Sequence, residues 1–306
     1  MRTAFINTLT ELAQKDKNIY LLTSDVGFSV VEGFIQKFPS RFINCGVAEQ
    51  NIVGMAAGLA LAGKKPYIYS IIPFIIFRCL EQLRNDICYQ NLDVKIVATG
   101  AGFTYGTLGF THFALEDIGI LRAIPNMTVL CPADPPETRE LILKSYQTKN
   151  PTFIRLYKGG EKTVYNFSPN IEIGKPSILK EGKDGVIIAI GLCVGMGMEV
   201  VDKLRESGYN FKLISLHTLK PIDNGALLAE LKDSKAIFTL EEHSIMGGLG
   251  SAMAEILMES GYKGIFKIFG IPDKYFSETG SAQYLQRKCG LSTEEIINHI
   301  LSKIHR

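Results

Sequence analysis

The chain has 306 residues, enough for two domains that each bury a hydrophobic core. Hydrophobic residues make up 46% and charged residues 21% of the sequence, which excludes a disordered chain and is typical of a globular protein. The formal net charge of +2 and the lack of a basic run argue against binding to nucleic acid or to an anionic membrane surface.

Short β-rich runs alternate with helical patterns through the first half of the chain. Residues 1–18 predict an amphipathic helix. Strands are predicted at residues 19–23, 66–70, 94–99, 127–131 and 152–157. Helices are predicted at about residues 74–89, 116–123 and 136–148. Continuous apolar strands that alternate with helices indicate a mainly parallel sheet covered on both faces.

The composition changes between residues 158 and 183, where glycine, proline and charged residues dominate. We therefore place a first domain at 1–160, a linker at 161–182 and a second domain at 183–306. The second domain repeats the α/β pattern, with strands at residues 186–190, 211–215, 236–240 and 265–269, and helices at 194–207, 224–231, 247–261 and 291–304. The predicted fold class is α/β, with two domains that are each a mainly parallel sheet flanked by helices.

The stretch INCGVAEQNIVGMAAGLALAG, residues 43–63, predicts an extended segment, a turn at Gly46 and a helix rich in glycine and alanine. Because small side chains let other backbone approach closely, we expect this helix to be buried against another element. Glu49 lies in its first turn. This carboxylate either complements the helix dipole or shares a proton through a hydrogen bond in a desolvated site.

The glycine-rich loop GAGFTYGTLGFTHF, residues 100–113, follows a strand and so lies at the sheet edge where open α/β sheets bind ligands. It carries His112; a loop histidine can simply be solvated, but this position favours a functional role. Glu116 and Asp117 follow as possible helix caps. Earlier in the chain, Phe74 and Phe77 either belong to the core or form a stacking platform for a flat heterocycle.

Two motifs in the second half of the chain give weaker evidence of a functional site. The segment GLCVGMG, residues 191–197, has the wrong glycine spacing for a dinucleotide fingerprint, so we predict neither NAD nor FAD binding. Glu241, Glu242 and His243 precede a glycine-rich helix, but adjacent side chains do not converge on one ion. We expect a structural or interface role for these three residues, and we predict no metal site in this chain.

The segments GVAEQN, PYIYSIIPF, GFTH and AIPNMTVLCPAD, in this order, resemble transketolases and deoxyxylulose-phosphate synthases. The resemblance covers the whole chain and is to their C-terminal half, a pyrimidine-binding domain followed by the transketolase C-terminal domain. It implies the cofactor thiamine diphosphate, with Glu49 hydrogen-bonded to nitrogen N1′ of the aminopyrimidine ring. A desolvated carboxyl can share a proton with such a weakly basic nitrogen.

The same resemblance implies further cofactor contacts. Phe74 matches the residue that stacks on the ring, with Phe77 as the alternative. Asp25 matches a position near the cofactor, and Arg78 is a further cofactor-binding candidate.

On the substrate side, His112 matches the histidine that contacts a hydroxyl or carbonyl oxygen of the sugar. Arg2 and Lys158 match positions that hold the substrate phosphate, with lysine replacing the usual arginine at 158. Leu108 replaces an aspartate that recognises a sugar hydroxyl, and Gly100 replaces a histidine. Either the substrate is unchanged, or the enzyme prefers a deoxygenated, branched or otherwise modified sugar.

The family's GDG motif, which holds Mg²⁺ and the diphosphate, does not occur in the sequence. The resemblance therefore implies one subunit of a split enzyme, active only with an N-terminal partner that carries this metal site. The implied assembly is a heterotetramer of two chains each, with the cofactor at the interfaces between subunits.

The implied function is transfer of a two-carbon ketol unit from a ketose, usually phosphorylated, to an aldose acceptor. Alternatives are the β subunit of a 2-oxo acid dehydrogenase, a deoxyxylulose-phosphate-synthase-like enzyme, or a non-catalytic homologue that only binds a partner. Six scattered cysteines without a CxxC pair indicate reduced thiols and a cytoplasmic protein. The N-terminus lacks the apolar core of a signal peptide, and the most apolar run, residues 67–77, is too short to span a bilayer.

Overall fold

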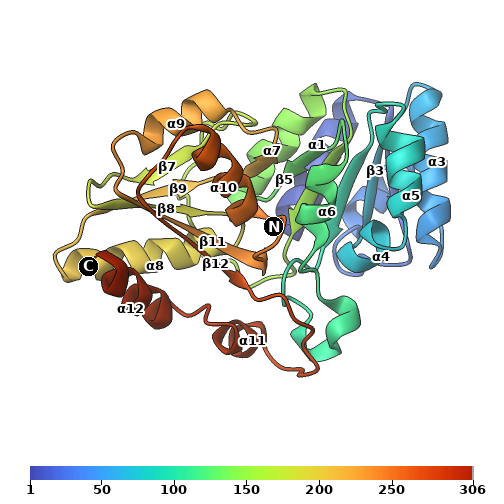
Figure 1. The fold of residues 1–306 in the computed structure, drawn as a ribbon. Coiled ribbons are helices and arrows are strands. Elements are labelled where there is room, and N and C mark those ends of the chain that lie inside the picture. Colours follow the sequence, from blue (N-terminus) through green and yellow to red (C-terminus); the bar gives the residue numbers. More distant parts are fainter. Residues whose placement is uncertain (305–306) are drawn as a thin grey trace.

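The computed structural model describes residues 1–304, which form two lobes side by side, each built around one sheet (Figure 1). The first lobe has a seven-stranded sheet in the order β10-β5-β6-β4-β3-β1-β2, and the second has a five-stranded sheet in the order β12-β11-β8-β9-β7. Both sheets are mainly parallel and flanked by helices, so the predicted α/β fold class is confirmed.

Six strands of the first sheet come from the first half of the chain and run parallel to one another: β1 (Ile19–Thr23), β2 (Phe42–Asn44), β3 (Lys65–Ile71), β4 (Lys95–Thr99), β5 (Thr128–Leu130) and β6 (Thr152–Leu156). The seventh strand, β10 (Thr218–Lys220), comes from the second half and pairs antiparallel with β5. The sequence did not predict this strand. Because it completes the first sheet, the two lobes share backbone hydrogen bonds.

The helices of the first lobe are α1 (Arg2–Lys15), α2 (Glu32–Lys37), α3 (Glu49–Leu61), α4 (Ile72–Ile76), α5 (Leu80–Gln82), α6 (Asp117–Ala123) and α7 (Pro135–Gln147). Short turns add the 3₁₀ segments η1 (Pro39–Arg41), η3 (Gly106–Leu108) and η4 (Phe110–His112), and the π-helical segment η2 (Leu83–Cys88). The single helix predicted at 74–89 is wrong, since the chain there is broken into α4, α5 and η2. Three residues between α4 and α5 form a turn, and Arg78 lies in it.

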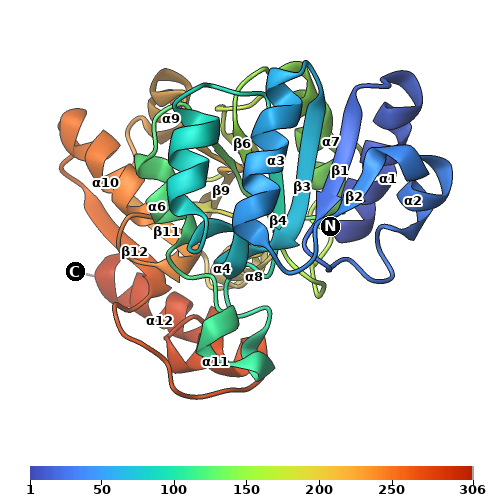
Figure 2. The same ribbon diagram turned by 90° about the vertical axis from the view of Figure 1, so that its right-hand side faces the viewer.

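Helix α3 only partly meets the expectation that it is buried. Val53, Ala56 and Ala57 face the sheet and are buried. Gly54 and Gly58 face outward with open space beyond them, and Leu61 is 64% exposed. Figure 2 shows α3 on the outside of the lobe, because the sheet covers only its inner face.

The sheet of the second lobe contains β7 (Ser177–Lys180), β8 (Gly185–Ala189), β9 (Phe211–Ser215), β11 (Ala236–Ser244) and β12 (Ile265–Ile271). Its helices are α8 (Cys193–Glu206), α9 (Asn224–Leu231), α10 (Leu249–Glu259), α11 (Ala282–Lys288) and α12 (Thr293–Ile304). Strand β7 lies within the segment that we assigned to the linker and pairs antiparallel with β9. Strand β11 runs past its predicted end, which places Glu241, Glu242 and His243 on a strand.

Within residues 1–304, no helix combines the length and apolar character needed to cross a membrane. All six cysteines are free thiols.

Candidate active site

The candidate residues of the first lobe gather at the carboxyl ends of its parallel strands. Glu49 begins α3 just after β2, and its side chain is only 2% exposed. Strand β3 leads directly into α4 with Phe74, and β4 leads into the loop with His112. Since β1, β2, β3 and β4 are parallel neighbours, the turns that follow them meet at one edge.

Glu49, Arg78 and Phe74 form the centre of this group. The guanidinium of Arg78 donates a hydrogen bond from Nη1 to Glu49 Oε2 at 2.5 Å. Its Cζ lies 5.0 Å from the centroid of the Phe74 ring, within range of a cation–π contact. The flat Arg78 cation therefore contacts both a buried carboxylate and an aromatic ring. We call the space that it fills between Glu49 and Phe74 the slot.

His112 lies next to Phe74 in this group. Its imidazole packs edge-on against Phe74, with the ring centroids 5.2 Å apart, and lies 6.2 Å from the ring of Tyr105. Nδ1 of His112 is 3.1 Å from the hydroxyl of Thr111, a contact in which either atom can donate. The glycine-rich loop thus brings its histidine to the aromatic ring beside Glu49.

Asp25 is hydrogen-bonded through Asn44 to the turn that precedes Glu49. It sits in the left-handed region with φ 56°, at the end of β1. Its carboxylate accepts a hydrogen bond from Asn44 Nδ2 at 3.0 Å, while Asn44 Oδ1 accepts from the backbone N–H groups of Asp25 and Gly46. The asparagine therefore couples Asp25 to the turn that leads into α3.

Arg2 and Lys158 lie together, although 156 positions separate them in the chain. Arg2 Nε donates to the backbone carbonyl of Lys158 at 3.0 Å. Lys158 Nζ lies 5.3 Å from the centroid of the Tyr105 ring, which in turn faces His112. Leu108 lies on η3 of the same loop and is 56% exposed. Tyr105 therefore lies between His112 on one side and the Arg2–Lys158 pair on the other.

An open cavity of about 480 Å³ lies between α4 and the His112 loop. Phe74, Phe77 and Arg78 line one side, and Phe110 and Thr111 line the other. Tyr275, from the second lobe, also lines the cavity and packs edge-on against Phe110, with the ring centroids 4.8 Å apart. Nothing in the sequence indicated this contribution from the second lobe.

A buried hydrogen-bond network holds the His112 loop in place, and the sequence analysis missed its central residue, Arg155. This arginine binds Asp117 through two hydrogen bonds of 2.8 and 3.1 Å and donates to the Ala114 carbonyl at 2.8 Å. The neighbouring carboxylate raises the pKa of Arg155 well above its ordinary value, despite the opposing effect of burial. An arginine in the apolar strand TFIRLY was itself a signal, since a buried cation needs a buried acid.

Glu242 supports the same loop from the second lobe. Its carboxylate accepts hydrogen bonds from Phe103 N at 3.1 Å and from Gln286 Nε2 at 2.9 Å. Burial raises the pKa of Glu242. Gly102, with φ 59°, lies so close to this carboxylate that a Cβ atom would overlap it. The loop and the second lobe therefore fit together at a position where only glycine has room.

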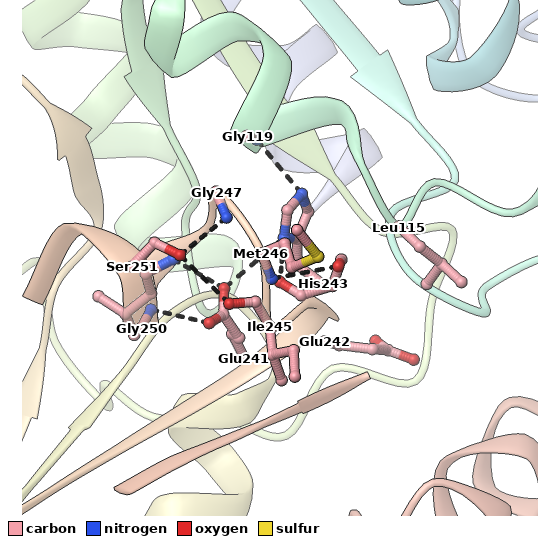
Figure 3. A network of polar contacts seen from close by, with 12 residues as sticks. Leu115, Gly119, Glu241, Glu242, His243, Ile245, Met246, Gly247, Gly250 and Ser251 are labelled. Carbon is pink, nitrogen blue, oxygen red and sulfur yellow. Dashed lines mark hydrogen bonds and ion pairs between the residues drawn. The ribbon is translucent and has the colours of Figure 1, made fainter. Parts of the chain in front are cut away.

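Glu241 and His243 lie on the same strand but make different hydrogen bonds. The Glu241 carboxylate accepts from Leu249 N and Gly250 N and so caps α10, as Figure 3 shows for Gly250. His243 Nε2 accepts from Gly119 N, and burial lowers the pKa of this histidine to about 4, which keeps it neutral. The structural role expected for these residues fits these contacts.

The acid and the ring fit an aminopyrimidine. The Glu49 carboxylate and the Phe74 ring hold the guanidinium of Arg78, which is a planar N–H donor. A flat heterocycle with N–H groups would be held by the same two contacts. Within residues 1–304, His, Cys, Asp and Glu form no group of three or more that could hold a metal ion.

Comparisons with known proteins match both halves of the chain to known domains. Residues 1–160 match the transketolase pyrimidine-binding domain, and residues 174–296 match the transketolase C-terminal domain. A protein of Methanocaldococcus jannaschii described as a transketolase C-terminal section is 38% identical over 100% of this chain and 96% of its own length. One of the subunits of the apulose-4-phosphate transketolase of Phocaeicola vulgatus is 35% identical over 100% of this chain and 97% of its own length.

Longer relatives match as well. The 1-deoxy-D-xylulose-5-phosphate synthase of Shouchella clausii is 35% identical over 99% of this chain, which spans 48% of that enzyme. Among solved structures, a split-gene transketolase described as an inactive β4 tetramer superposes with a TM-score of 0.88 at 35% identity, covering 99% of this chain and 97% of that one. The predicted resemblance is confirmed: this chain belongs to the transketolase family and corresponds to the C-terminal subunit of its split members.

Proposed function

We propose that this chain works with thiamine diphosphate as the C-terminal subunit of a transketolase, which moves a two-carbon ketol unit from a ketose to an aldose. The observation that carries the proposal is a series of contacts at the sheet edge, in which Arg78 links Glu49 to Phe74 and Phe74 packs against His112. It joins a buried acid, an aromatic ring and an imidazole, the groups needed to hold a heterocycle and a sugar oxygen.

Thiamine diphosphate, when bound, supplies the carbon nucleophile that accepts the two-carbon unit from one sugar and passes it to the next. Glu49 holds a proton shared with ring nitrogen N1′, in a buried position where a hydrogen bond is stronger than in water. Phe74, or Phe77 beside it, supports the ring by stacking. His112 donates to a hydroxyl or carbonyl oxygen of the substrate and so orients it.

We assign the anionic end of the substrate to Arg2 and Lys158. Their contact places two cations close to Tyr105, whose ring faces His112, so a sugar that reaches the imidazole can extend toward them. Leu108 cannot accept a hydrogen bond from a sugar hydroxyl. We therefore propose a modified sugar as the preferred substrate. The relative named for apulose 4-phosphate supports a specialised substrate in this family.

We propose that the diphosphate and Mg²⁺ are held mainly by an N-terminal partner subunit, in a heterotetramer of two chains each. The sequence lacks GDG, and the described residues offer no group of metal ligands. The outward face of α3, with Gly54, Gly58 and exposed Leu61, lies on the helix that Glu49 begins and offers an uncovered surface for that partner. Asp25 and Arg78 would then lie near the cofactor at the subunit interface.

We keep the domain limits 1–160, 161–182 and 183–306 as a proposal. The free state of all six cysteines supports a cytoplasmic location.

The test is co-purification with a GDG-bearing partner encoded nearby, followed by a screen of ketose donors with aldose acceptors. We expect a stable complex and Mg²⁺-dependent ketol transfer. A complex that instead forms 1-deoxy-D-xylulose 5-phosphate would favour the synthase activity for which the longer relatives are named. Association with a lipoyl-domain protein would favour the 2-oxo acid dehydrogenase, and a complex without any transferase activity would favour a non-catalytic homologue.

A further inference from the structure

Arg78 occupies an unusual position for a surface arginine. It lies in the turn between α4 and α5, and its side chain is 46% exposed, yet its guanidinium reaches the 2%-exposed carboxylate of Glu49. The same guanidinium lies over the Phe74 ring. Gln50 Nε2 donates to the backbone carbonyl of Arg78, which ties the turn to α3 independently of the side chain.

A guanidinium has the shape and hydrogen-bonding edge of a small heterocycle. It is planar, it stacks on aromatic rings, and its N–H groups point outward in the plane toward carboxylates. Those are the two contacts that the proposed function assigns to the aminopyrimidine ring, one with Glu49 and one with an aromatic face. Two planar groups cannot occupy the same slot at the same time.

We propose that Arg78 is a placeholder for the cofactor ring: its guanidinium fills the slot between Glu49 and Phe74 and has to leave before the ring can enter. The inference rests on the proposed function and deepens it. In the placeholder state Arg78 neutralises the buried Glu49 charge, which would otherwise be costly. The apparent affinity for the ring is then reduced by the fraction of time that the slot is filled.

The surroundings of Arg78 allow the side chain to move while the backbone stays. Arg78 lines the 480 Å³ cavity, so the guanidinium has open space next to the slot. Glu116 lines the same cavity and offers a carboxylate away from Glu49.

The experiment measures binding of 4-amino-5-hydroxymethyl-2-methylpyrimidine, the ring fragment alone, to the whole chain by ligand-observed NMR. We compare the unsubstituted chain with Arg78→Ala, Glu49→Gln and the double variant, with Arg84→Ala as a matched control on the neighbouring η2. Thermal unfolding checks that each variant is folded. We expect Arg78→Ala to bind on the order of tenfold more tightly if the slot is free about a tenth of the time. Glu49→Gln should weaken binding in the Arg78→Ala background.

Salt provides a second readout. Added salt screens the partly buried Arg78–Glu49 pair only weakly, so fragment affinity should rise slightly with ionic strength in the unsubstituted chain and stay constant in Arg78→Ala. Equal, weaker or undetectable binding by Arg78→Ala would overturn the placeholder, because the arginine would then assist the ring or be irrelevant to it. The proposed function would survive that result if Glu49→Gln still weakened binding, whereas no effect of Glu49→Gln in any background would count against the role of Glu49 itself.

Discussion

At the scale of single residues, the site depends on a carboxylate that the fold has removed from water. Glu49 begins a helix, but its 2% exposure and its contact with Arg78 distinguish it from a surface carboxylate that only complements the helix dipole. Its partner is the Arg78 guanidinium, which also lies over the Phe74 ring, so this carboxylate belongs to a side-chain cluster rather than only to the end of a helix.

Glu49→Gln tests that role in the assembled enzyme. An amide cannot share a proton with a ring nitrogen as a carboxyl does, so kcat should fall on the order of a hundredfold or more while the fold is kept. Steady-state kinetics with the best donor measures the effect, with exposed Glu81→Gln on α5 as the control. Near-normal turnover of Glu49→Gln would remove Glu49 from the mechanism.

Leu108 tests substrate choice. An apolar side chain at this position leaves a sugar hydroxyl without its partner, which costs about 1–3 kcal/mol, so ordinary pentose phosphates should be poor substrates. Leu108→Asp should raise kcat/KM for xylulose 5-phosphate with ribose 5-phosphate, and the exposure of Leu108 makes the substitution tolerable. If the unsubstituted enzyme already reached about 10⁴ M⁻¹s⁻¹ with these sugars, altered specificity would be rejected.

At the scale of elements, the loop of residues 100–113 is positioned from both lobes. An isolated bridge between Gly102 and Ala114 closes its base, and Gly280 N donates to Gly106 O from the second lobe. Glu242 holds Phe103 at the start of the loop. The placement of His112 therefore depends on the C-terminal domain as well as on the sheet from which the loop emerges.

Replacing Glu242 should loosen this loop. Glu242→Ala removes the acceptor for Phe103 N and Gln286 Nε2, at a cost of about 1–3 kcal/mol, and should speed hydrogen exchange in residues 103–112. Turnover should fall because His112 is less well placed. Glu242→Gln keeps one carbonyl oxygen and should restore much of the protection. Unchanged exchange in Glu242→Ala would show that other contacts hold the loop.

At the scale of the whole molecule, buried acids connect the lobes. Glu137 on α7 accepts from Ser215 Oγ on β9 at 3.2 Å and from Tyr165 OH at 3.3 Å. Asp134 accepts from Val164 N and Tyr165 N, both at 2.8 Å, and so holds the connecting segment against α7. Burial raises the pKa of Glu137 to about 7, so this carboxyl is largely protonated in the folded protein below neutral pH.

The raised pKa of Glu137 predicts a pH-dependent contribution to stability. It is fully present below the unfolded pKa near 4.5 and is lost as pH rises through about 7, because the unfolded chain releases the proton more readily. Glu137→Gln cannot ionise. Relative to the unsubstituted chain, its free energy of unfolding should therefore rise by about 2–3 kcal/mol between pH 5 and pH 8. Urea unfolding at both pH values measures this difference, and a pH-independent difference would contradict the assignment.

The isolated chain should bind thiamine diphosphate poorly. The diphosphate and its Mg²⁺ carry much of the cofactor's charge, and we assign their site to the partner subunit. Calorimetry on the chain alone should show weak binding that Mg²⁺ does not strengthen. Adding the partner should produce Mg²⁺-dependent binding. Tight, Mg²⁺-dependent binding without a partner would instead mean that this chain holds the metal.

Local patterns in the sequence predicted the parts of the fold that depend on local physics. Strands β1 and β9 and helix α9 have the predicted bounds, because apolar runs and helical periodicity report burial within one element. The alternation of strands and helices determined the α/β class. It also placed the His112 loop at the carboxyl edge of the first sheet, and the structure brings Glu49 to the same edge.

Tertiary structure alone decided the contacts between distant segments. Strand β10 joins the first sheet, and Tyr275 lines the cavity. Arg155 binds Asp117 across 38 positions of the chain, and Glu242 binds Phe103 across 139 positions. Hydrophobic periodicity shows which face of an element is buried, but it does not identify the element that covers that face. Strand β10 and Glu242 find their partners only when the two lobes pack together, whereas Arg155 and Asp117 meet within the first lobe.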